Sequence, residues 1–262
     1  MSLATSTIIT MCSHHWLLAW LGLELNTLSI LPIIIKSHHP RATEAATKYF
    51  LIQATAAALI LFASTMNAWQ TGHWTITHTS PHMTTIITLA IMLKLGLAPM
   101  HQWYPEVLQG STISTALIIS TWQKLAPLTL LSLISNNLPT NIILLIGLTS
   151  ALTGGWTGLN QTQTRKIMAF SSIAHMGWLI ITLNLNLHLT TMTMLIYMMM
   201  TTAMFLSLNM TTTKTLTDLN TTHSQSPSLT VMMMITLMSL GGLPPLTGFT
   251  PKWLILSHMC HT

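Results

Sequence analysis

The chain has 262 residues, of which 50% are hydrophobic and only 5% are charged. A soluble domain carries about 25% charged residues, so this chain lacks the polar side chains needed to cover a globule in water. Its formal charge of +5 comes from nine basic and four acidic residues, which are too few and too scattered for a nucleic-acid-binding surface. Composition therefore indicates an integral membrane protein and excludes a nucleic-acid partner.

Long apolar runs set the fold class. A helix needs about 20 residues to cross a hydrocarbon core roughly 30 Å thick, and runs such as 142–159 and 192–210 lack the alternating polarity of barrel strands. Because backbone polar groups must be paired within lipid, we predict an all-α polytopic transmembrane helix bundle. The expected helices are a partial helix in the first dozen residues, then 15–35, 48–67, 84–104, 112–134, 141–160, 167–185, 191–210 and 228–250, and a last segment from Trp253.

Two of the expected helices carry a glycine–proline interruption. Residues 96–99 read Gly-Leu-Ala-Pro, and residues 242–245 read Gly-Leu-Pro-Pro. A proline frees the carbonyl four residues earlier, here those of Leu95 and Leu240, and in lipid these groups need protein or water as partners. Similar breaks in two halves of a chain are typical of antiporter-like inverted repeats. Two ordinary proline kinks would explain the same residues.

The basic loop residues separate by side. If successive loops alternate across the membrane, the loops at 36–47, 105–111, 161–166 and 211–227 share one face, and those at 68–83, 135–140 and 186–190 share the other. The second set contains no Lys or Arg. By the positive-inside rule the first face is the cytoplasm-like side, which would be the matrix in a mitochondrion. Trp74 and Pro139, in loops of the second set, are expected on the opposite face. The basic residues of the first set are Lys36, Arg41, Arg165, Lys166 and Lys214.

Ionisable residues inside apolar helices are the candidate functional residues. A lysine at the bilayer centre costs roughly 2.5–3.5 kcal/mol, so it is rarely kept without a role. Lys94, Lys124 and Glu24 lie in three separate apolar runs, and Lys252 follows the second break. We expect Glu24 within ion-pair or one-water distance of Lys94. We also expect the three lysines to form a row near the membrane midplane, with His175 between them as a proton relay.

Each of these residues has a structural alternative. A fixed ion pair would only hold helices together, and Lys252 could extend its ammonium to the membrane interface. His175 could be a hydrogen-bonded structural residue. Glu44 and Lys48, four residues apart, are interpreted as a surface pair.

The sequence offers no sign of a cofactor or metal in this chain. Cys12 and Cys260 lie far apart without CxxC-type spacing and are interpreted as unpaired, buried small residues. The chain has no GxGxxG or P-loop motif, no cysteine cluster for iron–sulfur ligation and no haem motif. We therefore expect neither a redox cofactor nor a metal site here.

Six motifs along the chain are specific enough to compare with known families. They are GLELNT (22–27), the stretch 36–50 with PRATEAATKYF, PEVLQG (105–110), TWQKLAP (121–127), GLNQTQTRKI (158–167), and 241–249 followed by Pro-Lys-Trp (251–253). In order and through essentially the whole chain, they resemble the subunit 2 family of mitochondrial NADH dehydrogenase, in its vertebrate form. These subunits are antiporter-like membrane components of respiratory complex I.

The resemblance implies a role for each candidate residue. Glu24 matches the family's helix carboxylate, and Lys94 matches its partner lysine on the first broken helix. Lys124 matches the central lysine, and Lys252 the terminal lysine on the second broken helix. His175 falls where relatives also have a histidine. These matches imply a core membrane subunit of NADH:ubiquinone oxidoreductase that contributes to proton translocation and spans the inner mitochondrial membrane several times.

The resemblance also sets expectations about partners and extent. It implies contact with lipid and with other membrane subunits of complex I, including neighbouring antiporter-like subunits, while NADH, flavin, iron–sulfur clusters and ubiquinone bind elsewhere in the complex. Residues 1–262 are expected to be a single membrane domain, a fragment lacking a short N-terminal piece and the C-terminal helices. A stand-alone cation/proton antiporter and an inert structural scaffold are the alternative functions.

Overall fold

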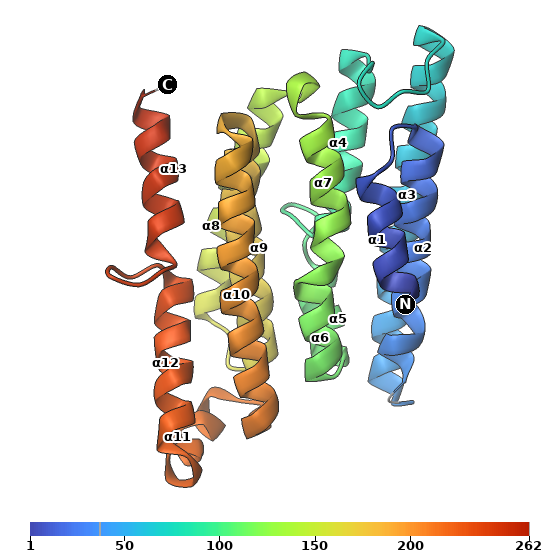
Figure 1. The fold of residues 1–262 in the computed structure, drawn as a ribbon. Helices are drawn as coiled ribbons and strands as arrows, with labels where there is room; N and C mark the ends of the chain where they lie inside the picture. Colours follow the sequence, from blue (N-terminus) through green and yellow to red (C-terminus); the bar gives the residue numbers. More distant parts are fainter. Residues whose placement is uncertain (37, 262) are drawn as a thin grey trace.

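The protein is a bundle of helices that stand side by side (Figure 1). The computed structural model describes residues 1–36 and 38–261, without the side chains of Asn220, His223, Gln225 and His261. Within these residues there are no β-strands, only two isolated bridges, His15 with Thr75 and Gln163 with Thr215. The predicted all-α fold is therefore confirmed.

The helices follow one another in chain order. They are α1 (Ser2–Met11), α2 (Trp16–Ile35), α3 (Pro40–Thr71), α4 (Pro81–Leu95), α5 (Trp103–Gly110), α6 (Ile113–Ser120), α7 (Leu125–Leu133), α8 (Thr140–Leu159), α9 (Thr164–Leu185), α10 (Leu187–Thr211), α11 (Leu216–Gln225), α12 (Pro227–Gly241) and α13 (Phe249–His261), with short 3-10 turns η1 (Trp122–Lys124) and η2 (Ser135–Asn137).

In the described ranges, six helical stretches are long and apolar enough to cross a membrane: α2, α3, α6 with η1 and α7, α8, α9 and α10. The longest is α3, whose 32 residues correspond to about 48 Å at 1.5 Å per residue. A hydrocarbon core is only about 30 Å thick, so part of α3 extends beyond it. This helix begins eight residues before the predicted start at 48, because Pro40 occupies its first turn and the His39 side chain accepts a hydrogen bond from the Arg41 N–H.

Both glycine–proline segments break a helix completely. The predicted helices 84–104 and 228–250 are wrong as single helices, since each consists of two segments separated at residues 96–102 and 242–248. Gly96 and Gly242 adopt φ values of 73° and 83°, in the left-handed region that favours glycine. In both places the next residue, Leu97 or Leu243, donates its N–H back to the carbonyl five residues earlier. These are Schellman-type ends, so the glycines terminate the helices before the prolines are reached.

A third interruption was not predicted. The expected helix 112–134 is divided into α6 and α7 by η1, next to Thr121 with φ −111° and ψ −70°. Pro127 lies in the first turn of α7, where N–H groups have no partner within the helix. The sequence after the break is therefore suited to starting a new helix. Lys124 is the last residue of η1.

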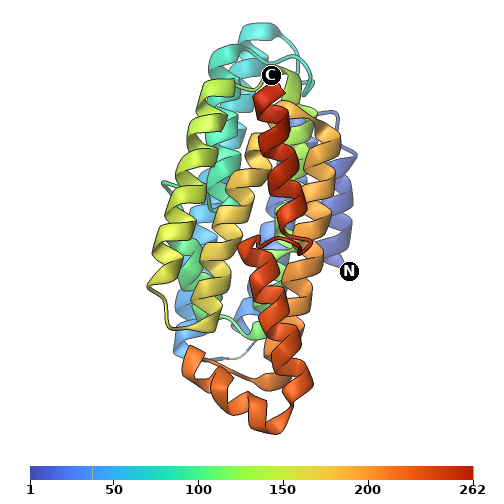
Figure 2. The same cartoon turned by 90° about the vertical axis from the view of Figure 1, so that its left-hand side faces the viewer.

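The breaks lie in the middle of the bundle and the loops at its ends. Figure 1 shows the α4–α5 connection and the α12–α13 connection at similar heights. Figure 2 shows α12 and α13 following one another along the bundle, with α11 at its end. The predicted loop 211–227 thus contains a helix. Thr215 and Asp218 form a capping box at its start.

The predicted charge separation between the two ends is confirmed. Figure 1 shows the end of α2, the starts of α3 and α9 and the α10–α11 connection at one end of the bundle, and these segments contain the five basic loop residues. There the Arg165 guanidinium donates to the Ser111 carbonyl, and the Lys214 backbone carbonyl accepts from the Thr164 N–H. At the other end, the His15 ring stacks on Trp74 with centroids 5.6 Å apart. We call the first end the basic face.

Candidate functional site

Lys94 lies at the end of α4, where the first break begins. Its side chain is buried, and its Nζ atom has no hydrogen-bond partner among the described residues. The carbonyl of the same residue, freed by the helix end, accepts a hydrogen bond from Gln53 Nε2 at 3.2 Å. A carbonyl at this break thus has a protein partner, as expected for a broken helix inside a bundle.

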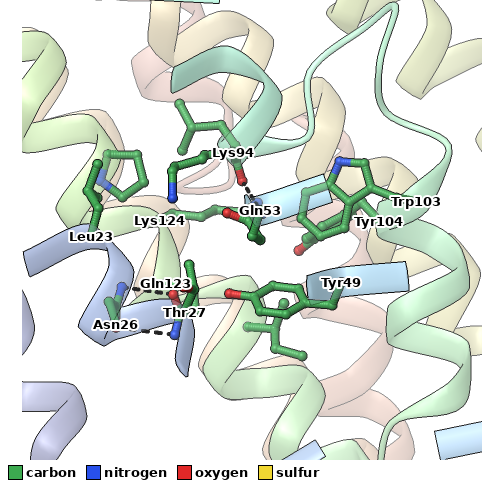
Figure 3. Close-up of a pocket in the computed structure, with 13 residues that line it drawn as sticks. Leu23, Asn26, Thr27, Tyr49, Gln53, Lys94, Trp103, Tyr104, Gln123 and Lys124 are labelled. Carbon is green, nitrogen blue, oxygen red and sulfur yellow. Dashed lines mark hydrogen bonds between the residues drawn. The ribbon is translucent and has the colours of Figure 1, made fainter. Parts of the chain in front are cut away.

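The Lys94 side chain opens onto a small internal space, which we call the inner cavity (Figure 3). Its free volume is about 20 Å³, which is enough for one water molecule. Lys124 lines the same cavity, so the structure brings the first two predicted lysines together. The lining residues are Leu23, Asn26, Thr27, Tyr49, Gln53, Lys94, Leu95, Trp103, Tyr104, Ile119, Gln123, Lys124 and Pro127.

Glu24 does not form a direct ion pair with Lys94. No Glu24 oxygen lies within 4.0 Å of the Lys94 ammonium, although the two groups interact electrostatically. The Glu24 Oε2 atom is buried and, like Lys94 Nζ, has no hydrogen-bond partner among the described residues. Of the two predicted arrangements, direct contact is therefore wrong. A pair linked through one water stays a prediction.

Lys124 has the most complete environment of the three lysines. Its ammonium donates to the Tyr197 hydroxyl at 3.0 Å, and that hydroxyl donates to the Ser120 carbonyl at 3.0 Å. The same ammonium lies 4.9 Å from the centre of the Tyr104 ring and 5.0 Å from that of Tyr197. Both distances are within the range of a cation–π interaction. Tyr197 on α10 therefore fixes a residue that lies at a helix break.

Beyond Tyr197 the structure places His175. The two ring centres are 5.7 Å apart, and His175 Nε2 lies 3.0 Å from the Leu240 carbonyl oxygen. A carbonyl only accepts, so Nε2 carries the proton. This carbonyl is one of the two that the sequence predicted to be freed by a proline, and His175 is its partner.

Lys252 lies at the second break. Its ammonium donates to the Gly241 carbonyl at 3.1 Å and packs against Gly242, where a Cβ atom would lie only 2.7 Å from Nζ. Lys252 therefore reaches back to the broken helix end and does not extend to the interface. With His175 and Tyr197 it lines a second small space of about 20 Å³, which we call the terminal cavity.

The predicted residues thus follow one another across the bundle. Lys94 and Lys124 share the inner cavity, Lys124 bonds to Tyr197, and Tyr197 contacts His175. His175 shares the terminal cavity with Lys252 and interacts electrostatically with both Lys252 and Lys124. His175 thus lies between Lys124 and Lys252, while its role as a proton relay and the position of the lysines near the membrane midplane stay predictions.

Sequence reasoning missed the tyrosines and one amide pair. Asn26 Nδ2 donates to Gln123 Oε1 at 2.8 Å, and Gln123 Nε2 donates back to Asn26 Oδ1 at 3.3 Å, which ties α2 to the turn that carries Lys124. The chain has only three tyrosines, and all three line the inner or terminal cavity. A tyrosine in an apolar helix needs a partner for its hydroxyl, which was a usable signal.

The remaining predictions have mixed outcomes. Lys48 and Glu44 form the expected pair at 2.6 Å, and Glu106 joins them at 2.7 Å from Lys48. Cys12 and Cys260 are unpaired, as predicted, but both are exposed, so their predicted burial is wrong. Within the described residues, no group of three or more His, Cys, Asp or Glu side chains is placed to hold a metal ion.

A helical membrane bundle with two glycine-terminated breaks, a buried lysine beside the first and a half-buried lysine beside the second, has the architecture of an antiporter-like membrane subunit. The family described as "NADH:quinone oxidoreductase/Mrp antiporter, TM" matches residues 13–262, and the chain belongs to this family. It is 57% identical over 259 residues to NADH-ubiquinone oxidoreductase chain 2 of Carassius auratus and 55% identical over 260 residues to that of Coturnix japonica. These matches cover 98% and 99% of this chain and 74% and 75% of the relatives.

Solved structures agree with this assignment. The fold matches a chain of respiratory complex I from Thermus thermophilus with bound aureothin, with a TM-score of 0.91 and 27% identity. It also matches a chain of the Mrp complex from Dietzia sp. DQ12-45-1b, with a TM-score of 0.86 and 15% identity, which shows the fold alone. Each match covers 99% of this chain. The matches cover 62% of the Thermus thermophilus chain and 54% of the Dietzia chain.

Proposed function

We propose that this chain is a core membrane subunit of NADH:ubiquinone oxidoreductase and contributes to proton translocation across the inner mitochondrial membrane. The observation that carries the proposal is Lys94, a buried lysine that has no hydrogen-bond partner in the described part of the chain and shares a water-sized cavity with Lys124. A purely structural lysine would be expected to be paired, because an unpaired buried charge is strongly destabilising. Family membership and the relatives' names support the assignment to this complex.

The side chains suggest how a proton would move. When Lys124 is a neutral amine, one water in the inner cavity can receive a proton from the Lys94 ammonium and pass it to the Lys124 nitrogen. From there the Tyr197 hydroxyl and His175 lead to the terminal cavity and Lys252. Because these groups lie close together, the charge on one changes the proton affinity of the next. A proton arriving at one lysine therefore favours departure of a proton from its neighbour.

The proposal assigns electron transfer to other parts of the complex. NADH, flavin, iron–sulfur clusters and ubiquinone would bind in other subunits, and this chain would use energy transmitted from them. Its partners would be the other membrane subunits, including neighbouring antiporter-like ones, together with the lipid of the inner mitochondrial membrane. The exposed leucines and methionines of α8, α10 and α12 are suited to such contacts.

The substitution Lys94→Met tests the proposal, because it removes the charge and keeps an unbranched apolar side chain. In the assembled complex we expect fewer protons translocated per NADH oxidised, with normal amounts of complex. Lys214→Met, which removes an exposed charge from the basic face, is the matched control and should change neither quantity. Normal proton translocation by the Lys94→Met complex would contradict the proposal and favour an inert scaffold.

A stand-alone cation/proton antiporter is the second candidate, because the fold is shared with the Mrp complex. The same buried lysines would then exchange protons for a cation without electron transfer. Reconstitution of the chain alone in vesicles distinguishes the two functions. Sodium-driven proton movement by the isolated chain would favour the antiporter, whereas proton translocation that requires the complete complex favours the proposed function.

A further inference from the structure

A third cavity lies on the basic face, between the start of α3 and α5. It has a volume of about 380 Å³ and is lined by Arg41, Glu44, Lys48, Glu106 and Lys166, among others. Inside it the Lys48 ammonium is held between two carboxylates, with Glu44 Oε1 at 2.6 Å and Glu106 Oε2 at 2.7 Å. We call these three residues the Lys48 ion network, and the space the basic-face cavity.

The network uses a large share of the chain's acidic residues. The chain has four in total, and two of them converge on Lys48. Of the others, Glu24 is within α2, and Asp218 accepts hydrogen bonds from the backbone N–H groups of Lys214 and Thr215. One carboxylate would be enough to hold Lys48 on its own helix. Glu106 adds a link between α3 and α5 and a second group that can take up a proton.

The network lies where water has access. Glu44, Lys48 and Glu106 keep 61%, 40% and 52% of their side-chain surface exposed. Glu44 and Lys48 belong to the part of α3 nearest the basic face, and Glu106 lies beside them on α5. The helix α3 is about 18 Å longer than a hydrocarbon core. The Lys48 ion network is therefore in the interfacial region, where a carboxylate exchanges protons with bulk water.

The same two helices continue inward to the inner cavity. Tyr49 follows Lys48 directly. Gln53 lies five residues after Lys48 on α3, which places it about 7.5 Å further along the helix axis from the basic face. On α5, Trp103 precedes Glu106 by three residues. Tyr49, Gln53 and Trp103 all line the inner cavity. The basic-face cavity and the inner cavity are thus separated by little more than one helical turn.

Two aromatic rings lie between the basic-face cavity and the inner cavity. The Tyr49 and Trp103 rings pack edge to face with centroids 5.9 Å apart, and both side chains are buried. On the inner side, Trp103 Nε1, Tyr104 Oη and Lys94 Nζ are buried without a hydrogen-bond partner among the described residues. Three unpaired polar atoms beside one cavity are the pattern that a bound water satisfies.

We propose that the Lys48 ion network is a proton-uptake site on the basic face, and that the Tyr49–Trp103 ring pair separates it from the inner cavity. A proton from water binds the Glu106 carboxylate to give a carboxylic acid, and the contact between Glu106 and Lys48 weakens. The proton then leaves through water past the ring pair to the inner cavity, and the carboxylate re-forms its ion pair with Lys48. This inference rests on the proposed function.

The test compares Glu106→Gln, its conservative counterpart Glu106→Asp and two reference substitutions in the assembled complex. Glu106→Gln keeps the shape of the side chain but cannot take up a proton at neutral pH. Asp218→Asn is the matched control, because it makes the same change on the basic face outside the cavity and keeps a carbonyl acceptor for the helix cap. Lys94→Met reports on proton translocation by the chain itself. Protons translocated per NADH oxidised and the amount of assembled complex are measured for each.

We expect Glu106→Gln to lose at least half as much proton translocation as Lys94→Met, Glu106→Asp to restore most of it, and Asp218→Asn to remain normal. A loss with Lys94→Met but none with Glu106→Gln would overturn the uptake site and leave the proposed function intact. No loss with either would overturn the proposed function itself. If Glu106→Gln does not assemble, Lys48→Gln decides, since it removes the ion pair that Glu106 must re-form when it releases its proton: reduced translocation supports the site, and normal translocation overturns it.

Discussion

The three lysines differ in what surrounds each ammonium. Lys94 has no hydrogen-bond partner among the described residues, Lys124 has a hydroxyl and two ring faces, and Lys252 has one backbone carbonyl. An ammonium has three donors, so none of these environments is saturated by protein groups alone. Water in the inner and terminal cavities would complete them. Such incompletely satisfied lysines are suited to exchanging protons.

Replacing Tyr197 with phenylalanine isolates one of these contacts. The hydroxyl that accepts from Lys124 is removed, while the ring stays against the ammonium. A hydrogen bond to a charged group contributes about 1.5–3 kcal/mol, so we expect a clear decrease in protons translocated per NADH with normal assembly. The matched control is Thr202→Val on the same helix, because the Thr202 hydroxyl donates to the Met199 carbonyl of that helix and, among the described residues, forms no hydrogen bond with a lysine. Equal translocation by both variants would show that Lys124 does not depend on Tyr197.

At this scale the sequence predicted the charged residues but not their partners. Glu24, Lys94 and Lys124 were found because charges inside apolar runs are rare. Tyr197 lies 73 residues from Lys124, and Asn26 lies 97 residues from Gln123. Such pairs become neighbours only in the folded bundle, so no local residue spacing predicts them. The possibility of a direct Glu24–Lys94 contact was wrong for the same reason, because two buried charges in an apolar sequence do not fix the distance between their side chains.

At the scale of elements, glycines decide where helices end and how closely they approach. The breaks were predicted from proline, but the ends are set by the left-handed conformation of Gly96 and Gly242. The start of α11 had a readable signal, Thr215 followed three residues later by Asp218, which the polar character of the segment obscured. For the division between α6 and α7, Pro127 is the one signal that the local sequence offers. Element type was therefore predictable, and the boundaries depended on capping.

Two adjacent glycines of α8 give a paired stability test. A Cβ atom on Gly154 would lie 2.7 Å from the Ala174 backbone nitrogen of α9, whereas one on Gly155 would have no neighbour within 4 Å. Gly154→Ala should therefore push α8 from α9 and destabilise the chain by about 1–3 kcal/mol. Gly155→Ala should be neutral or slightly stabilising, because alanine favours a helix by about 1 kcal/mol over glycine. The thermal midpoint in detergent checks this, and a similar decrease in both variants would contradict it.

The cap of α11 makes a prediction about pH. The Thr215 backbone N–H and hydroxyl, together with the Lys214 backbone N–H, hold the pKa of the Asp218 carboxyl below its usual value. A lowered pKa stabilises α11 above the ordinary pKa of an aspartate, and this stabilisation is lost as the pH falls through the lowered value.

Amide hydrogen exchange in α11, corrected for intrinsic rates, checks the prediction. Protection should be constant near neutral pH and fall in acid, and Asp218→Ala should lose protection at neutral pH, roughly fivefold, as expected for a lost cap. The same acid-dependent loss in Asp218→Ala as in the unaltered chain would show that another group is responsible.

At the scale of the whole molecule, the predicted grouping of the loops agrees with the structure, which places the basic loops at one end of the bundle. This grouping was predictable because charge and hydrophobicity are distributed along the chain in a pattern that follows the helices. Which end faces the matrix stays a prediction. The order of sites across the bundle was not, since α4, η1, α9, α10 and α13 are brought together only by tertiary packing.

The substitution Lys124→Ala tests the central claim of a proton path through this chain most directly, because Lys124 joins the inner cavity to Tyr197. The measurement is the number of protons translocated per NADH oxidised by the assembled complex in sealed vesicles. We predict that this number falls by the whole contribution of this subunit, while assembly is largely intact and the fall matches that of Lys94→Met. An unchanged number of protons per NADH in an assembled Lys124→Ala complex would contradict a path through these lysines.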